Sequence, residues 1–487
     1  MQKLVQSNNY ASTTCINIET HRDPIKVNRT AVETTTEAQS PIEEITERFS
    51  IEVIESNSDN PEIYYPEGGL RAYSVVLGSF IGLVATFGTL NSVGAIQTYV
   101  STHQLAGIKT STISWIFSIY IALSFANCMV VGPLFDVKGA LLPMLVGTLM
   151  IFGGLMAVAN CTTVVQFIFA LSICVALGNS LTITPLVGVI SHWFNLKRGR
   201  ALGLATIGGS VGGIVIPLML ESLYDKVGFP WAIRILAFFC LACHITAIVL
   251  CRERISSTGV TTPSSDDSTG WKNNELLVSL IQIKDQFEFK ALLDMKYLFC
   301  IIGTFFTEIA LLSMVTYLAT YAISKGMTES KSYILLTIFN ATGVLGRLVP
   351  GILADKFGHF NVMVLMLIGF SLSMLILWLP FGSNHGVLYA FTAICGVFSS
   401  SILSLTPVCL GGITPVHKFG QRYGLLYFFV SLGNLFGIPV SAAIIGEGSS
   451  HNYDMFALFC CIFGVVGTCC WYVSRFFIVG WKLNVRV

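Results

Sequence analysis

Two ionisable side chains, Glu308 and Arg347, lie inside long apolar stretches of this 487-residue chain. A carboxyl group in apolar surroundings can carry a proton, and a guanidinium group there can bind an anion or a solute with several hydrogen-bond acceptors. For Glu308 the sequence leaves two readings open, a proton carrier or a protonated acid bonded to a neighbouring helix. For Arg347 we favour substrate binding or gating over a purely structural pairing. Both residues are therefore predicted to line a substrate pathway.

Glycines and an aspartate form a repeated pattern, G-x-x-x-D-x-x-G, at residues 132–139 and 351–358. Each copy follows one apolar run and precedes another, so we expect it in a loop of a few residues. Glycine permits sharp turns and close helix approach, and aspartate can cap the next helix or pair with a basic residue across the bundle. One copy would indicate only a tight turn. Two copies at matching positions predict a gating latch made of Gly132, Asp136, Gly139, Gly351, Asp355 and Gly358.

The duplicated pattern indicates two related halves. The sequence LTITP at 181–185 recurs as LSLTP at 403–407, at nearly the same offset of roughly 220 residues. A membrane protein built from two repeated bundles typically works by alternating access to a substrate held between them.

The elements that must position these residues are membrane helices. The chain is 53% hydrophobic and only 11% charged, and its apolar residues form runs of about 20, the length that crosses a bilayer. We therefore predict an all-α membrane protein with twelve transmembrane helices in two six-helix pseudo-repeat bundles. The predicted spans are 72–98, 113–135, 140–160, 164–191, 201–223, 230–250, 296–322, 331–353, 361–380, 386–412, 423–446 and 454–478.

Polar stretches divide the chain into five predicted parts. Residues 1–67 carry 12 acidic and 5 basic side chains, which is typical of a disordered tail. The bundles are expected at 68–250 and 296–480, joined by a linker at 251–295 and followed by a short end at 481–487. Within the linker, residues 276–293 have the helical spacing of a segment lying on the membrane surface.

The distribution of basic residues predicts the orientation. With the N-terminus in the cytoplasm, inner loops and the C-terminal end carry 16 Lys and Arg, against 4 in outer loops. Basic residues are enriched on the cytoplasmic side of membrane proteins. Both termini are therefore expected in the cytoplasm. No signal peptide is expected, because the first 67 residues contain no apolar core.

Further polar groups at membrane depth complete the predicted pathway: Asn91, Asn340 and Tyr427, with Asn127, Asn179, Thr184, Tyr423 and Asn434 as additional candidates. Each alone is more often a bond between helices, but the set suits a planar, hydrogen-bonding solute, on which aromatic rings could stack. Small residues at 208–213, with Gly433, Gly437 and Pro439, are predicted to mark the interface between the moving halves.

Several motifs resemble a known family. PEGGLRAY at 66–73 and HWFNLKRGRALG at 192–203 resemble the two signatures of the monocarboxylate transporter family, within the major facilitator superfamily. Segments 205–213, 293–300 and 378–382 resemble its fungal branch, and the resemblance extends over 66–487. It implies the major facilitator fold and a riboflavin-like solute as substrate, ahead of a monocarboxylate.

The chain departs from this family at the residues that handle protons. Animal members that couple to protons have a lysine in the first span and an aspartate four residues before the arginine of the eighth. Here those positions are Asn91 and Gly343. The substitutions favour facilitated diffusion, with proton coupling through Glu308 as the alternative.

The remaining expectations concern partners and location. No nucleophile–base pair, phosphate loop or cysteine–histidine metal spacing is present in the sequence, so we predict no enzymatic activity, no cofactor and no bound metal. The expected partners are a small organic solute and the lipid bilayer, without nucleic acid, for a monomeric protein. The resemblance implies the plasma membrane, with the vacuolar membrane as alternative. A non-transporting membrane nutrient sensor is the other functional class considered.

Overall fold

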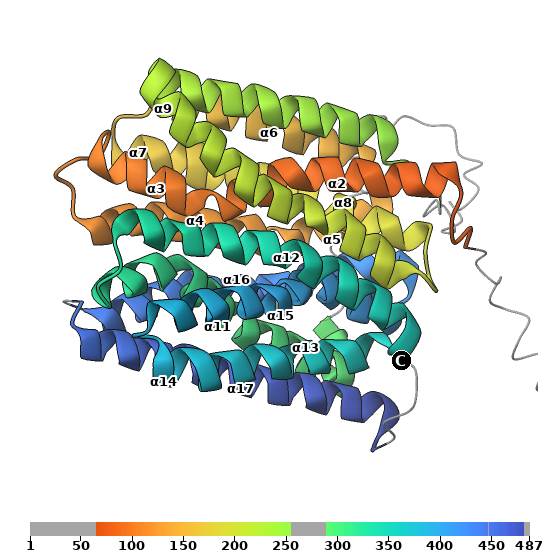
Figure 1. Cartoon of the computed structure of the whole chain (residues 1–487). Helices are drawn as coiled ribbons and strands as arrows, with labels where there is room; N and C mark the ends of the chain where they lie inside the picture. Colours follow the sequence, from red (N-terminus) through yellow and green to blue (C-terminus); the bar gives the residue numbers. More distant parts are fainter. Residues whose placement is uncertain (1–64, 255–288, 447, 482–487) are drawn as a thin grey trace, which may run out of the picture. The chain divides into compact units, whose positions relative to one another are not determined.

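The computed structural model describes residues 65–254, 289–446 and 448–481 (Figure 1). Most of the predicted tail, most of the linker with the larger part of segment 276–293, and residues 482–487 lie outside the described residues. Within the described residues every regular element is a helix.

The N-terminal half holds the helices of the first six predicted spans. In chain order they are α2 (Leu70–Asn91), α3 (Val93–Thr102), α4 (Thr110–Ala126), α5 (Cys128–Lys138), α6 (Leu141–Val158), α7 (Val164–Phe167), η1 (Ile168–Val175), α8 (Ala176–Gly188), η2 (Val189–His192) and α9 (Arg198–Leu250).

The C-terminal half repeats this plan. Its elements are η3 (Phe289–Leu293), α11 (Met295–Ser324), α12 (Glu329–Phe357), α13 (His359–Ser373), η4 (Met374–Trp378), α14 (Leu379–Phe381), α15 (His385–Gly412), η5 (Val416–Lys418), α16 (Phe419–Ile445) and α17 (Ser450–Val479).

The prediction of twelve membrane crossings is confirmed. In the described residues, eleven helical stretches are long and apolar enough to cross a bilayer. The longest, α9, has 53 residues and reverses direction at Gly228, whose φ of 72° is accessible to glycine at little cost. Pro230 follows and fixes the start of the second arm. The two arms of α9 therefore cross the membrane separately, and eleven stretches make twelve spans.

The buried apolar residues show how the two halves meet. We define the terminal face as the end of the bundle where α2 begins and α17 ends, and the distal face as the opposite end. One apolar cluster joins residues of both halves and, in the N-terminal half, includes residues near the terminal face such as Phe135, Val189 and Leu202. A second cluster belongs to the N-terminal half alone and includes Val100, Ile113 and Phe229 near the distal face. The halves thus share a core on the terminal side and keep separate cores on the distal side.

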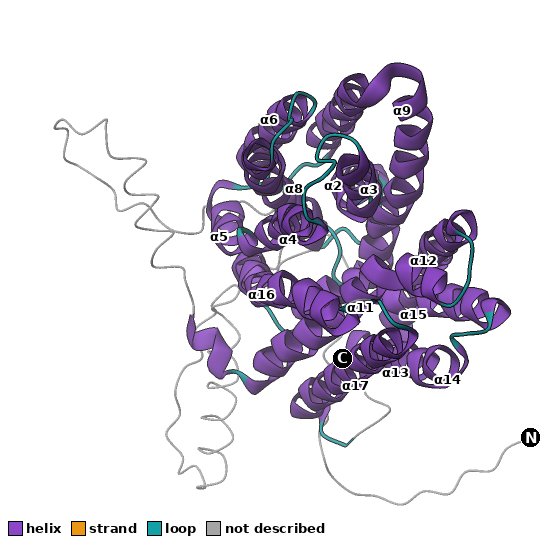
Figure 2. Cartoon of the chain, turned by 90° about the vertical axis from the view of Figure 1, so that its left-hand side faces the viewer, coloured by secondary structure: helices purple, strands orange, loops and turns teal. Residues whose placement is uncertain are grey.

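The most extensive contacts between the halves are formed by the second span of each half with the fifth span of the other. In the end-on view of Figure 2, α12 lies beside α9, and α16 lies beside α4 and α5. The pairs are related by the internal repeat, because α4–α5 and α12 are the second spans of their halves while the first arm of α9 and α16 are the fifth.

The glycines of these helices do not all lie between the halves, contrary to the prediction. Gly208 and Gly212 face α2 within the N-terminal half, and Gly433 and Gly437 face Ile309 of α11 within the C-terminal half. Of the segment 208–213, Gly209 and Gly213 approach the other half, at Arg347 and Asn340. Small residues therefore bring helices together inside each bundle as well as between the bundles.

Packing at Gly212 gives a testable prediction of folding. A β-carbon added there would meet the Val84 carbonyl oxygen and lie 2.6 Å from the Gly88 α-carbon. We expect Gly212→Val to separate α2 from α9 at a cost of about 1–3 kcal/mol, lowering the thermal midpoint of the detergent-solubilised protein. Gly153→Ala is the matched control, because nothing lies within 4 Å of its added methyl group. Equal midpoints for the two variants would contradict the close α2–α9 contact.

Candidate gate and substrate pathway

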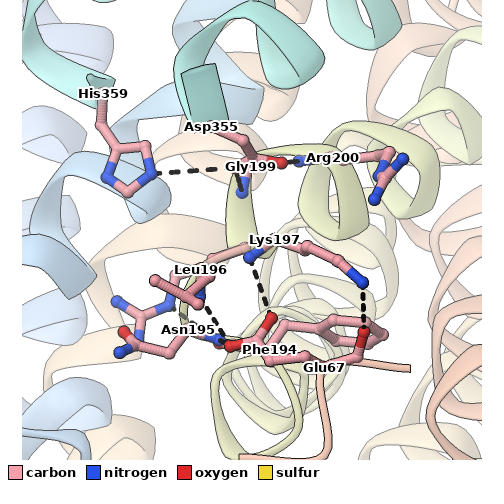
Figure 3. A network of polar contacts seen from close by, with 10 residues as sticks. Glu67, Phe194, Asn195, Leu196, Lys197, Gly199, Arg200, Asp355 and His359 are labelled. Atoms are coloured by element: carbon pink, nitrogen blue, oxygen red, sulfur yellow. Dashed lines mark hydrogen bonds and ion pairs between the residues drawn. The ribbon is translucent and has the colours of Figure 1, made fainter. Parts of the chain in front are cut away.

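The two aspartates of the repeated pattern each cap a helix of the opposite half. Asp136, near the end of α5, accepts hydrogen bonds from the backbone N–H groups of Gly420 at 2.9 Å and Gln421 at 2.8 Å, at the start of α16. Asp355, near the end of α12, accepts bonds from Gly199 at 2.7 Å and Arg200 at 3.0 Å, at the start of α9 (Figure 3). In each case the bonded groups are the second and third residues of the capped helix.

The capped helices lack a cap of their own. The residues at their N-cap positions are Lys197 and Lys418, and neither makes a side-chain capping bond. A lysine side chain has no hydrogen-bond acceptor, whereas the first N–H groups of a helix need one. The carboxylate from the other half supplies it and also interacts favourably with the positive end of the helix dipole. The main partners of the aspartates are therefore backbone groups of the opposite half, which the sequence did not predict. Asp355 in addition lies 3.8 Å from the imidazole of His359, the first residue of the next helix, α13.

The glycines of the pattern allow this approach. Gly132 packs on the backbone of Gly420, and Gly351 packs on the backbone of Gly199. A β-carbon at either position would therefore collide with the backbone of the facing helix. Most of the pattern is helical rather than loop, which corrects the prediction. Only Gly139 and Gly358 lie at the turns, with φ of 79° and 96°.

The two family-like signatures of the sequence bind each other at the terminal face. The Glu67 carboxylate accepts three backbone hydrogen bonds, from Asn195 and Leu196 at 2.7 Å and from Lys197 at 3.0 Å (Figure 3). The ammonium group of Lys197 donates back to the Glu67 carbonyl oxygen at 2.9 Å. Glu67 has a φ of 53°, unusual for a residue other than glycine. The segment before α2 is thereby fastened to the loop that leads into the helix capped by Asp355.

Arg347 lies at the contact between the halves, deeper than the caps. Its side chain is buried, and one guanidinium nitrogen donates to the Thr206 carbonyl oxygen of α9 at 2.5 Å. Its Nε atom has no hydrogen-bond partner among the described residues. Gly343, one turn before this arginine, packs near the hydroxyl groups of Ser400 and Ser210. The arginine is therefore held partly by backbone and keeps a free donor.

Glu308 and Tyr427 lie close to this arginine. The Glu308 carboxyl group is buried in α11, near enough to Arg347 and Tyr427 for electrostatic interaction, but forms no ion pair within 4.0 Å with Arg347. One of its oxygens has no partner in the described part of the chain. The Tyr427 ring stacks on Phe125 of α4 with centroids 5.2 Å apart. This aromatic pair joins the two halves at mid-span.

The two predicted asparagines meet around Gly213. A β-carbon there would lie 3.1 Å from the Asn340 amide oxygen and 3.1 Å from the Asn91 β-carbon, although these asparagines belong to opposite halves. The Asn91 amide donates to the Gly209 carbonyl oxygen at 3.0 Å, and the Asn340 amide donates to Leu336 of its own helix at 3.1 Å. The structure therefore places Arg347, Tyr427 and Asn340 against the N-terminal half, with Asn91 beside the same glycine as Asn340. Glu308 lies near Arg347 within the C-terminal half.

A second repeat, overlooked at the sequence level, accounts for the pairing of helices. The pattern K-x-G-x-x-x-G occurs at 197–203 and again at 418–424, at the start of both capped helices. Its glycines, Gly199 with Gly203 and Gly420 with Gly424, face the backbone of α12 and of α5 respectively. Comparing the two halves for further repeats, beyond the aspartate pattern, would have found this signal.

Comparisons with known proteins agree with this architecture. The sequence matches the profile of the Major Facilitator Superfamily over residues 75–360 and 326–478. It is 40% identical to the riboflavin transporter MCH5 of Saccharomyces cerevisiae, over 88% of this chain and 82% of that protein. It is 32% identical to the MFS transporter asaE of Aspergillus flavus (86% and 90% covered) and 30% identical to the aspyridones efflux protein apdF of Emericella nidulans (82% and 78% covered).

Among solved structures, the chain is similar to the proton:xylose symporter XylE bound to 6-bromo-6-deoxy-D-glucose. The TM-score is 0.61 at 13% sequence identity, covering 82% of this chain and 94% of that one. At this identity the likeness concerns the fold.

The two caps predict a stability effect. Removing either carboxylate leaves two helix N–H groups without an acceptor, at a cost of about 0.5–2 kcal/mol. We expect Asp136→Ala and Asp355→Ala each to lower the thermal midpoint in detergent, and the double variant to show the sum, because the caps belong to different helix pairs. Asp225→Ala, at an exposed aspartate of the bend in α9, is the control. Midpoints equal to that of the control would show that the caps contribute nothing.

Proposed function

The chain belongs to the Major Facilitator Superfamily, and we propose that it carries a riboflavin-like solute across the membrane by alternating access. The observation that carries this proposal is the contact between the halves. Both aspartate caps, the glycine contacts and the shared core lie on the terminal side, whereas the cores separate toward the distal side.

The terminal face is the cytoplasmic face in this proposal, as the basic residues indicate. The structure then corresponds to a carrier closed to the cytoplasm. Asp136 and Asp355, with Gly132, Gly139, Gly351 and Gly358, form its inner gate. Opening the gate breaks four backbone hydrogen bonds to two aspartates. Because each cap contributes only about 0.5–2 kcal/mol, the closed state can be reversed by the modest free energy of binding a solute on the other side.

The substrate proposal rests on the relative and on the pathway residues together. A 40%-identical relative is named as a riboflavin transporter. In the present chain an aromatic pair, two asparagines and a buried arginine lie at or beside the contact between the halves, and a buried glutamic acid lies near the arginine. These groups can stack on a planar ring and form several hydrogen bonds, which suits a flavin better than lactate or pyruvate.

The transport mode in this proposal is facilitated diffusion. The close partner of Arg347 is a carbonyl oxygen, not an acid. Gly343 occupies the position at which proton-coupled animal members of the resembled family have an aspartate. Glu308 is the acid at mid-span near this arginine, so proton-coupled transport through Glu308 is the alternative. We further propose that the protein acts as a monomer in the plasma membrane, the vacuolar membrane being the alternative location, and that it transports rather than only senses its solute.

Uptake measurements test the substrate. Cells lacking their own riboflavin carrier and expressing this protein should accumulate labelled riboflavin above vector-only cells, without raised uptake of labelled lactate or pyruvate. Accumulation should stop when internal and external concentrations are equal. Lactate uptake driven by an imposed proton gradient, without riboflavin uptake, would overturn the proposal in favour of the monocarboxylate alternative.

Glu308→Gln tests the mode of transport. The amide keeps the size and hydrogen-bonding ability of the side chain but cannot release a proton. For facilitated diffusion we expect riboflavin uptake by the variant to keep the pH profile of the original protein, and a protonophore to leave both unchanged. If the original protein lost uptake on protonophore addition and the variant were insensitive to it, Glu308 would be the proton carrier.

A further inference from the structure

Asn434 is a buried amide whose two polar atoms both lack a partner. It lies in α16 with 1% of its surface exposed, and neither Oδ1 nor Nδ2 has a hydrogen-bond partner among the described residues. An unpaired buried polar group typically costs about 1–3 kcal/mol. The other amides on or near the pathway differ, because the Nδ2 atoms of Asn91, Asn127, Asn179 and Asn340 each donate a hydrogen bond.

The helix places Asn434 on the face turned toward the N-terminal half. Gly420, Gly424 and Tyr427 form a stripe of α16 that contacts Gly132, Cys128 and Phe125 of the other half in succession. The helical spacing of three and four residues continues this stripe through Ser431 to Asn434. Asn434 is therefore two turns beyond the Tyr427–Phe125 pair, toward the distal face.

Its depth matches that of Glu308. The neighbouring glycines of α16, Gly433 and Gly437, pack against Ile309 of α11, the residue after Glu308. One Glu308 oxygen also lacks a partner among the described residues. Two helices of the C-terminal half thus hold buried hydrogen-bonding groups at one level that lack partners among the described residues.

The chemistry of an amide selects its ligand. Oδ1 accepts and Nδ2 donates, so both are paired only by a ligand edge that offers a donor beside an acceptor. A carboxylate offers acceptors alone and would leave Oδ1 unpaired, at the cost of a buried orphan group. An imide edge, C(=O)–NH–C(=O), offers the N–H and an adjacent carbonyl oxygen and satisfies both atoms at once.

We infer that Asn434 determines substrate specificity by forming a two-bond contact with the imide edge of the transported ring. This inference rests on the proposed function, because the isoalloxazine ring of riboflavin carries such an edge. Oδ1 accepts from the imide N–H, and Nδ2 donates to a neighbouring carbonyl oxygen. The Tyr427–Phe125 pair, two turns closer to the terminal face, limits how far the ring moves toward that face.

The test compares riboflavin with N3-methylriboflavin, in which a methyl group replaces the imide hydrogen. In cells expressing the original protein, we expect the methylated compound to inhibit labelled riboflavin uptake about tenfold to a hundredfold less well than unlabelled riboflavin. Asn434→Leu, similar in size, should weaken riboflavin inhibition by a comparable factor and remove the discrimination between the two compounds. Asn160→Leu is the matched control and should keep the discrimination, because Asn160 is exposed after the end of α6 and its amide donates to the Met156 carbonyl oxygen at 3.0 Å.

Thermal unfolding distinguishes recognition from a structural role. Leucine removes two unpaired buried polar atoms, so Asn434→Leu should keep or raise the thermal midpoint while losing discrimination. A lowered midpoint, with equal loss of affinity for both compounds, would assign Asn434 to helix packing and overturn the inference.

Failure of the inference and failure of the proposed function give different results. Riboflavin uptake with equal inhibition by both compounds overturns the role of Asn434 and leaves the proposed function standing. Absence of riboflavin uptake overturns the proposed function itself.

Uridine carries the same imide edge without the tricyclic ring. Uptake of labelled uridine in place of riboflavin, abolished by Asn434→Leu, would support imide recognition and replace flavin by a pyrimidine as the substrate.

Discussion

The arrangement of the two halves depends on helix ends that are capped from across the bundle. α9 and α16 begin with lysines at their N-cap positions, so each leaves N–H groups that its own sequence cannot satisfy. Asp355 and Asp136 satisfy them from the opposite half. A helix start that depends on another domain is complete only while the domains are together. This makes the caps sensitive to the relative position of the halves in a way that a local cap is not.

The rest of the terminal face is organised around these two contacts. Gly132 and Gly351 remove the side chains that would keep the helices apart, and Gly139 and Gly358 let the chain turn directly after the aspartates. Glu67 fastens the segment before α2 to the loop that enters α9. Deeper in the membrane, polar groups lie at the contact, from Arg347 on the Thr206 carbonyl oxygen to the asparagines around Gly213. Glu308 and Asn434, which have unpaired polar atoms among the described residues, are buried at the same level of the C-terminal half.

The internal repeat is kept at the helix caps of the terminal face and lost at mid-span. Both halves contribute an aspartate, a glycine contact and a K-x-G-x-x-x-G helix start. At mid-span the copies differ: Arg347 corresponds to Cys128, Tyr427 to Thr206, and Asn434 to Gly213, at the spacing set by the glycine pairs. Under the proposed function this difference is expected, because a symmetric gate can be built from identical contacts, whereas an asymmetric solute needs different groups on its two sides.

The sequence alone determined the fold class and the family-level function. Apolar runs of membrane-spanning length and the repeated motifs specify twelve helices in two halves, because span length and repetition are properties of the chain itself. Which face of each helix meets which neighbour was decided by the tertiary structure. Gly433 and Gly437 pack inside their own half, the aspartates bind backbone of the other half, and Asn91 and Asn340 both lie beside Gly213. The physical reason is that helices surrounded by lipid are apolar on most faces, so that hydropathy carries little information on their rotation or their partners. Close contacts between small residues and the pairing of a few polar groups decide both.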